Sequence, residues 1–102
     1  MSKFLIRWKV NPHMIPADPE AQVKLMSSLF KMAKEDAKAG VCLNWAMFPE
    51  ASGGISFTDQ SEEELASRLM KYYPYLFFKV KPLLSLDQAM RAFQKSVESM
   101  KK

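Results

Sequence analysis

Apolar and polar side chains alternate along residues 3–10, KFLIRWKV, a pattern typical of a β-strand with one buried face. Successive side chains of a strand point to opposite faces, so Leu5, Arg7 and Lys9 would share one face. The positions expected on the other, buried face are Phe4, Ile6, Trp8 and Val10.

A helix is predicted from residue 19 to residue 39. Asp18 offers an N-cap oxygen, Pro19 suits the first helical position, and Gly40 suits the C-terminal cap. The residues expected to form its apolar stripe are Met26, Leu29, Phe30, Ala33 and Ala37.

A hairpin is predicted next. Residues 41–48, VCLNWAMF, are apolar on both faces apart from Asn44, so we expect this second strand to be covered on both sides. A turn over residues 49–54 leads to a short third strand over residues 54–58, paired with the second.

Two capping boxes mark the remaining helices. Ser61 and Glu64 open a helix over residues 62–73, which Pro74 ends, and a fourth strand follows at residues 76–82. The positions that the helix should bury are Leu65, Ala66, Leu69 and Met70. The second box, Ser85 to Gln88, opens a last helix with an apolar stripe at Leu86, Met90, Phe93, Val97 and Met100.

The element order β-α-β-β-α-β predicts an α+β, ferredoxin-like fold with a four-stranded antiparallel sheet in the order 4-1-3-2. Both crossover helices would lie on one face of the sheet, and the helix at residues 86–100 is appended. The length of 102 residues fits a single domain over residues 1–102.

Four basic residues of the neighbouring first and fourth strands are expected on the open face of the sheet. We call them the basic quartet: Arg7, Lys9, Lys79 and Lys81. Like charges on adjacent strands repel unless water, an acidic partner or an anion lies between them. The pattern therefore indicates either a solvated face or a site for an anion.

The overall charge of the chain adds little to the prediction of an anion site. The net charge of +4 is compatible with anionic partners, but the basic residues are spread along the chain and predict no polyanion-binding tail. The single cysteine, Cys42, rules out an intrachain disulfide and favours a reducing, cytoplasmic setting. We see neither a signal peptide nor a membrane span.

Few residues are candidates for catalysis or metal binding. His13, the only histidine, lies in a loop flanked by prolines and could act as a general base or a haem ligand if that loop roofs a pocket; otherwise it is an ordinary loop residue. One histidine and one cysteine are too few for a structural zinc site, and we expect no metal and no cofactor. Trp45 could stack on a planar ligand, and Tyr73 and Tyr75 could rim a pocket.

Residues 39–84 resemble the muconolactone isomerase-like proteins of the dimeric α+β barrel superfamily. The resemblance lies in the segments LNWAMF, GGISFTD, SEEELASRL and YYPYLFFKVKPLL. It implies a homodimer in which two sheets pack through their open faces and enclose a small-molecule pocket. It also implies cofactor-free activities such as isomerase or monooxygenase. Where that family has a histidine after the fourth strand, this chain reads SLDQAMRAF, so no catalytic residue is carried over.

Three functions follow as hypotheses. The first is a dimer that binds a small anionic metabolite and that could isomerise or oxidise it with His13 as the base. The second is an RNA-binding module, which the third strand disfavours because GGISFT has one aromatic residue, Phe57, and no basic start. The third is a protein-interaction module that uses the last helix.

Overall fold

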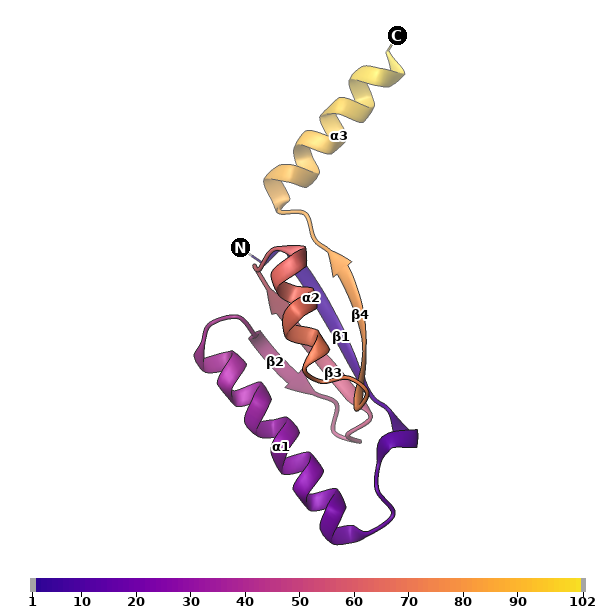
Figure 1. Cartoon of the computed structure of the whole chain (residues 1–102). Coiled ribbons are helices and arrows are strands. Elements are labelled where there is room, and N and C mark those ends of the chain that lie inside the picture. The colour runs from indigo at the N-terminus through magenta and orange to yellow at the C-terminus, as the bar shows by residue number, and fades with distance from the viewer. Residues whose placement is uncertain (1, 102) are drawn as a thin grey trace.

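The computed structural model describes residues 2–101 and has the predicted order of elements (Figure 1). In chain order these are β1 (Phe4–Val10), the short 3-10 helix η1 (Pro12–Met14), α1 (Pro19–Lys38), β2 (Leu43–Met47), β3 (Gly53–Thr58), α2 (Glu62–Met70), β4 (Leu76–Pro82) and α3 (Leu86–Met100). The strands form one antiparallel sheet in the order β2-β3-β1-β4, so the predicted ferredoxin-like topology is confirmed.

The core lies between α2 and the centre of the sheet. Phe4 and Ile6 of β1 form a buried cluster with Leu65 of α2, and Leu69 and Phe78 pack against it. Trp8 is buried on the same face of β1, as the alternating pattern predicts. The burial of these apolar side chains on one face fixes the register of the central strand.

The inward faces of α1 and α2 differ from the prediction at their C-terminal ends. Ala37 is exposed, and the buried position in that part of α1 belongs to Asp36. Met70 is 72% exposed, and α2 instead buries Arg68. In both helices a charged side chain occupies the inward position, because the two charges can reach each other. Ala66 of α2, which was also expected inside, is exposed.

The prediction that the second strand is covered on both sides is wrong. β2 is an edge strand, and Asn44, Trp45 and Ala46 are exposed. The register shifts between Leu43 and Ala46, where Asn44 has a positive φ of 49°. This bulge leaves Trp45 stacked on Trp8, with ring centroids 5.4 Å apart.

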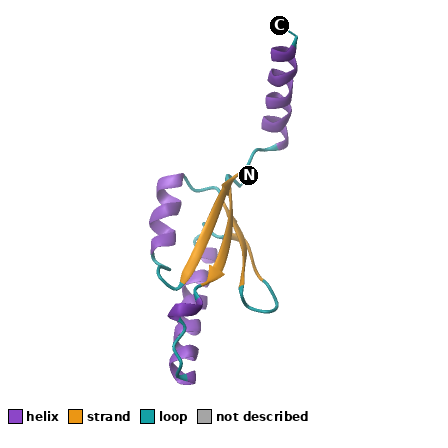
Figure 2. Ribbon diagram, turned by 90° about the vertical axis from the view of Figure 1, so that its right-hand side faces the viewer, coloured by secondary structure: helices purple, strands orange, loops and turns teal. Residues whose placement is uncertain are grey.

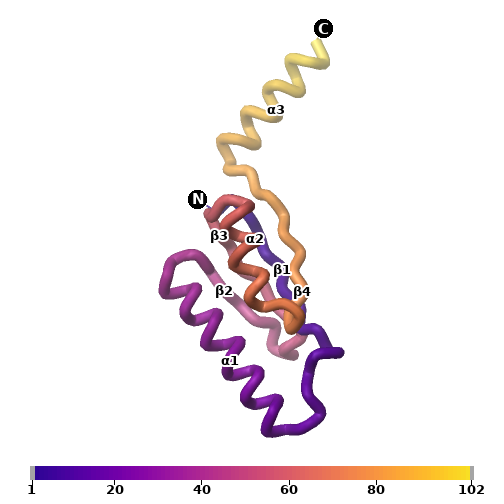
Figure 3. The backbone as a smooth tube through the Cα atoms, in the orientation of Figure 1, coloured from indigo at the N-terminus to yellow at the C-terminus, as the bar shows by residue number. Residues whose placement is uncertain are grey.

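The last helix extends away from the sheet. Figures 2 and 3 show α3 beyond the end of β4, and the molecule measures 65 × 26 × 24 Å. Phe93 is 69% exposed, in keeping with an apolar stripe that faces solvent. Within residues 2–101, no helix is long and apolar enough to span a membrane.

Candidate functional site

The open face of the sheet carries the basic quartet. In the β1–β4 register, Arg7 lies directly opposite Lys79, and Leu5 lies opposite Lys81. Lys9 lies opposite Phe77 on the same face, and all four basic side chains are exposed. The predicted gathering of these charges on one uncovered face is therefore confirmed, and Arg7 and Lys79 form a directly opposite pair of two cations.

Three members of the basic quartet line a hollow of about 460 Å³ at one end of this face. Arg7, Lys9 and Lys79 supply positive charge there, and Phe48 and Phe77 supply aromatic surface. Ser52 and the backbone of Gly53 lie at its border with the β2–β3 turn. A cavity with convergent charges and apolar walls is typical of a small-molecule site, and here the charges favour an anion.

The other predicted site residues lie away from this hollow. His13 is exposed on η1, and its backbone N–H donates to Asn11 Oδ1 at 3.1 Å. Tyr73 is 73% exposed in the turn before β4, and Tyr75 is half-buried at the end of that turn. Trp45 stacks on Trp8, whose side chain is on the helix-covered face. The fold therefore brings together the basic residues but not the aromatic and histidine candidates.

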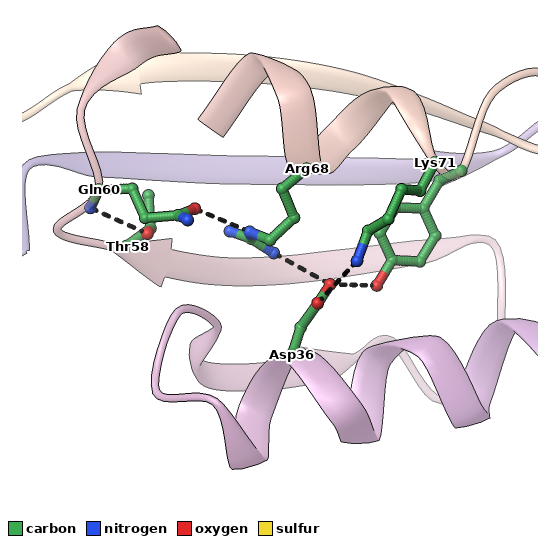
Figure 4. Close-up of polar contacts among 6 residues, drawn as sticks. Asp36, Thr58, Gln60, Arg68 and Lys71 are labelled. Atoms are coloured by element: carbon green, nitrogen blue, oxygen red, sulfur yellow. Dashed lines mark hydrogen bonds and ion pairs between the residues drawn. The ribbon is translucent and has the colours of Figure 1, made fainter. Parts of the chain in front are cut away.

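A second polar site, which the sequence pattern did not lead us to predict, is buried between α1 and α2 (Figure 4). Asp36 accepts a hydrogen bond of 2.6 Å from the Tyr72 hydroxyl and one of 3.0 Å from Lys71 Nζ. Arg68 Nη1 lies 3.5 Å from the same carboxylate, and Arg68 Nε donates to Gln60 Oε1 at 2.8 Å. We call this group, Asp36, Gln60, Arg68, Lys71 and Tyr72, the buried polar cluster.

The protonation states of the cluster follow from its contacts. Burial alone would raise the pKa of Asp36, but hydrogen bonds from Tyr72 and Lys71, with the charges of Lys71 and Arg68, hold it below its usual 3.8. Burial and the hydrogen bond to Asp36 raise the pKa of Tyr72 far above its usual value. At neutral pH one carboxylate therefore faces two cations and a neutral phenol, which leaves one positive charge in excess.

Helical spacing contained a signal for this cluster. Asp36 comes seven residues after Leu29, so the two lie on the same face of α1. Arg68 follows Leu65 at three residues on α2, again on the inward face. Two opposite charges on the inward faces of two packed helices would have predicted a buried pair. The pattern of apolar residues alone favours Ala37 and Met70 at these inward positions instead.

Known proteins give no further guide to the site. No family model matches the chain, and no curated protein matches it. Membership of the muconolactone isomerase-like group therefore stays a prediction. Among the described residues, no group of three or more histidine, cysteine, aspartate or glutamate side chains is placed to hold a metal ion.

Proposed function

We propose that the protein is a homodimer that binds a small anionic metabolite between the open faces of its two sheets. The observation that carries this proposal is the hollow in which Arg7 and Lys79 lie opposite each other across β1 and β4. Two cations at such a position destabilise the sheet unless they are solvated or share an anion. A bound carboxylate would accept hydrogen bonds from both side chains and remove that repulsion.

Apolar residues around the basic quartet support a second sheet as the cover. Leu5, Ile55 and Phe57 are half-buried on the open face, and Phe77 is 47% exposed there. Apolar side chains gathered on an uncovered sheet face favour an interaction site. A second copy would bring the same surface, and two-fold symmetry lets one patch cover the other.

Binding is better supported than catalysis. If the protein turns its ligand over, the resemblance to muconolactone isomerase-like proteins implies cofactor-free isomerisation or oxidation, with His13 as the base. His13, however, lies on η1 and is not among the described residues that line the hollow. An activity that survived the change His13→Ala would remove that role.

The double variant Arg7→Met, Lys79→Met tests the anion site. Each lost charge-assisted hydrogen bond is worth about 1.5–3 kcal/mol, so we expect binding of a small carboxylate such as succinate or benzoate to weaken at least about 100-fold. Isothermal titration calorimetry measures this. Lys24→Met on the exposed side of α1 is the matched control and should bind as the wild type does. Equal affinity in the double variant would contradict an anion site on the open face.

Light scattering across protein concentration tests the assembly. We expect the molar mass of two chains, and we expect Phe57→Glu to give one chain, because it places a charge within the covered face. Deletion of residues 86–102 should also weaken the dimer if the apolar stripe of α3 packs on the partner. A wild-type monomer at every concentration would contradict the proposed dimer. An unaltered dimer after the deletion would show that α3 does not contribute to the contact between subunits.

A further inference from the structure

A second cavity lies on the other side of the sheet, between α1 and the helix-covered face. Its volume is about 50 Å³. Its walls are mostly apolar and come from α1, the sheet and α2. The lining residues that matter here are Trp8, Phe30, Ala33, Trp45, Ser56 and Arg68.

Two buried N–H donors belong to residues that line this cavity, and both lack an acceptor. Trp8 Nε1 and Arg68 Nη2 find no hydrogen-bond partner among the described residues. Each residue is only 8% exposed, so bulk water does not solvate these groups. An indole N–H and a guanidinium can only donate, so the missing partner must be an acceptor. Buried polar groups without partners are rare in folded proteins, and each calls for an explanation.

The charge of the site favours an anionic acceptor over a neutral one. Asp36 is the carboxylate that faces Arg68, and both of its oxygens are already engaged: Oδ1 by Lys71, and Oδ2 by Tyr72 and Arg68. The half-exposed Lys71 carries the remaining positive charge of the buried polar cluster in contact with solvent, so the buried preference for an anion comes from Arg68. A guanidinium donates stronger hydrogen bonds to a carboxylate than to a neutral water molecule.

The size of the cavity selects a small acid. Its 50 Å³ exceeds the about 10–15 Å³ that a cavity needs to hold one water. It is well below the about 150 Å³ of an engineered cavity that takes up benzene. This size favours a carboxylate head with a short aliphatic stem over an aromatic ring. Phe30 and Trp45 line the cavity and are 43% and 37% exposed, so the cavity borders solvent at these two side chains.

We propose that Trp8 and Arg68 form a binding site for a short aliphatic monocarboxylic acid, with the carboxylate received by Arg68 Nη2 and the Trp8 indole N–H. This site is distinct from the open-face hollow, because the Trp8 side chain and Arg68 lie on the helix-covered side of the sheet, and of the described residues only Trp8 and Phe78 border both spaces. Its ligand would be held between α1, α2 and the sheet, and would join these layers when it binds.

Nuclear magnetic resonance of the indole N–H groups tests the site directly. The chain has two tryptophans, and the variant Trp45→Phe assigns the Trp8 signal. Titration with butyrate should shift the Trp8 indole proton downfield in a saturable way, because the proton gains an acceptor. Butyramide, which has the same shape but no charge, should bind at least about 10-fold more weakly.

Two variants separate this site from its surroundings. Arg68→Met keeps the length of the side chain and should weaken butyrate binding at least about 10-fold. Ala33→Leu fills the cavity from α1 and leaves both donors and the buried polar cluster in place. It should prevent butyrate binding, and it tests the site independently of whether Arg68→Met folds. Lys79→Met on the open face should leave the butyrate-induced shift unchanged.

Three results would overturn the proposal. The first is an indole proton that does not move in the wild type at about 10 mM butyrate, a concentration that reveals even weak binding. The second is equal binding of butyrate and butyramide, or a shift that persists in Ala33→Leu. The third is a nuclear Overhauser contact from the Trp8 indole to a long-lived water that butyrate does not displace, which would mean that water alone occupies the cavity.

Discussion

Replacing Gly54 with alanine should lower the melting temperature of the protein by about 12 °C or more. Gly54 lies between β1 and β2, where it pairs with Trp8 and Met47. A Cβ atom at this position would overlap the carbonyl oxygen of Ala46 and lie 2.6 Å from Cζ2 of Trp8. Neither neighbour can yield cheaply, because one is backbone and the other is a buried ring stacked on Trp45. Overpacking of this kind costs about 3 kcal/mol, and each kcal/mol shifts the melting temperature by about 4–8 °C in a domain of this size.

Gly40→Ala is the matched control for this prediction. Gly40 has a φ of +78°, and a Cβ added there would meet no atom within 4 Å, so alanine encounters only backbone strain. That strain costs about 1–2 kcal/mol, less than the clash at Gly54. Thermal unfolding followed by circular dichroism compares the two. If Gly54→Ala melts as high as Gly40→Ala, the close approach of the Ala46 carbonyl and the Trp8 ring to Gly54 is not present in solution.

Features that depend on neighbours in sequence could be predicted. Ser61 accepts from the Glu64 N–H and Glu64 in turn accepts from the Ser61 N–H, as the S-x-x-E spacing indicates. The second box, at Ser85 and Gln88, is also present. The alternation along β1 and β4 placed the basic quartet on the open face, because strand periodicity leaves only two faces to choose from.

Features that depend on distant partners could not be predicted in the same way. The apolar run of β2 fits a central strand and an edge strand equally well, and only the pairing with β3 decides between them. The direction of the Trp45 side chain depends on a bulge at Asn44, and the sequence there contains no glycine that would indicate a bulge. Tyr72 meets Asp36 across 36 residues of sequence, so its partner becomes visible only once α1 and α2 are packed.

Replacing Asp36 with alanine should lower the free energy of unfolding by about 3–5 kcal/mol. The side chain of Asp36 is 7% exposed, and it is the carboxylate that compensates the equally buried Arg68. Removing one partner of a buried ion pair leaves the other charge without compensation, which is the costly event. It also leaves the Tyr72 hydroxyl without its acceptor. Urea unfolding at pH 7 measures the difference.

Two further variants separate the buried pair from the rest of the buried polar cluster. Lys71→Met removes a half-exposed partner of Asp36 and should cost less than about 1 kcal/mol. The double variant Asp36→Leu, Arg68→Met removes both buried charges and should recover much of the loss, since apolar replacement of a whole buried pair is often neutral. A double variant as unstable as Asp36→Ala would mean that shape, and not charge, explains the loss.

The pH dependence of this loss of stability distinguishes a contribution from the Asp36 charge from a contribution of packing alone. The folded-state pKa of Asp36 is lowered, so its contribution to stability is complete above its ordinary value of 3.8 and disappears as the pH falls through the lower folded value. Once Asp36 is protonated, the wild type also holds Arg68 without a compensating charge, as Asp36→Ala does at every pH. The difference in unfolding free energy between the two proteins should therefore shrink as the pH is lowered below about 4. A difference that stays constant as the pH falls well below about 4, through the lowered pKa of Asp36, would show that the carboxylate charge does not stabilise the contact between α1 and α2.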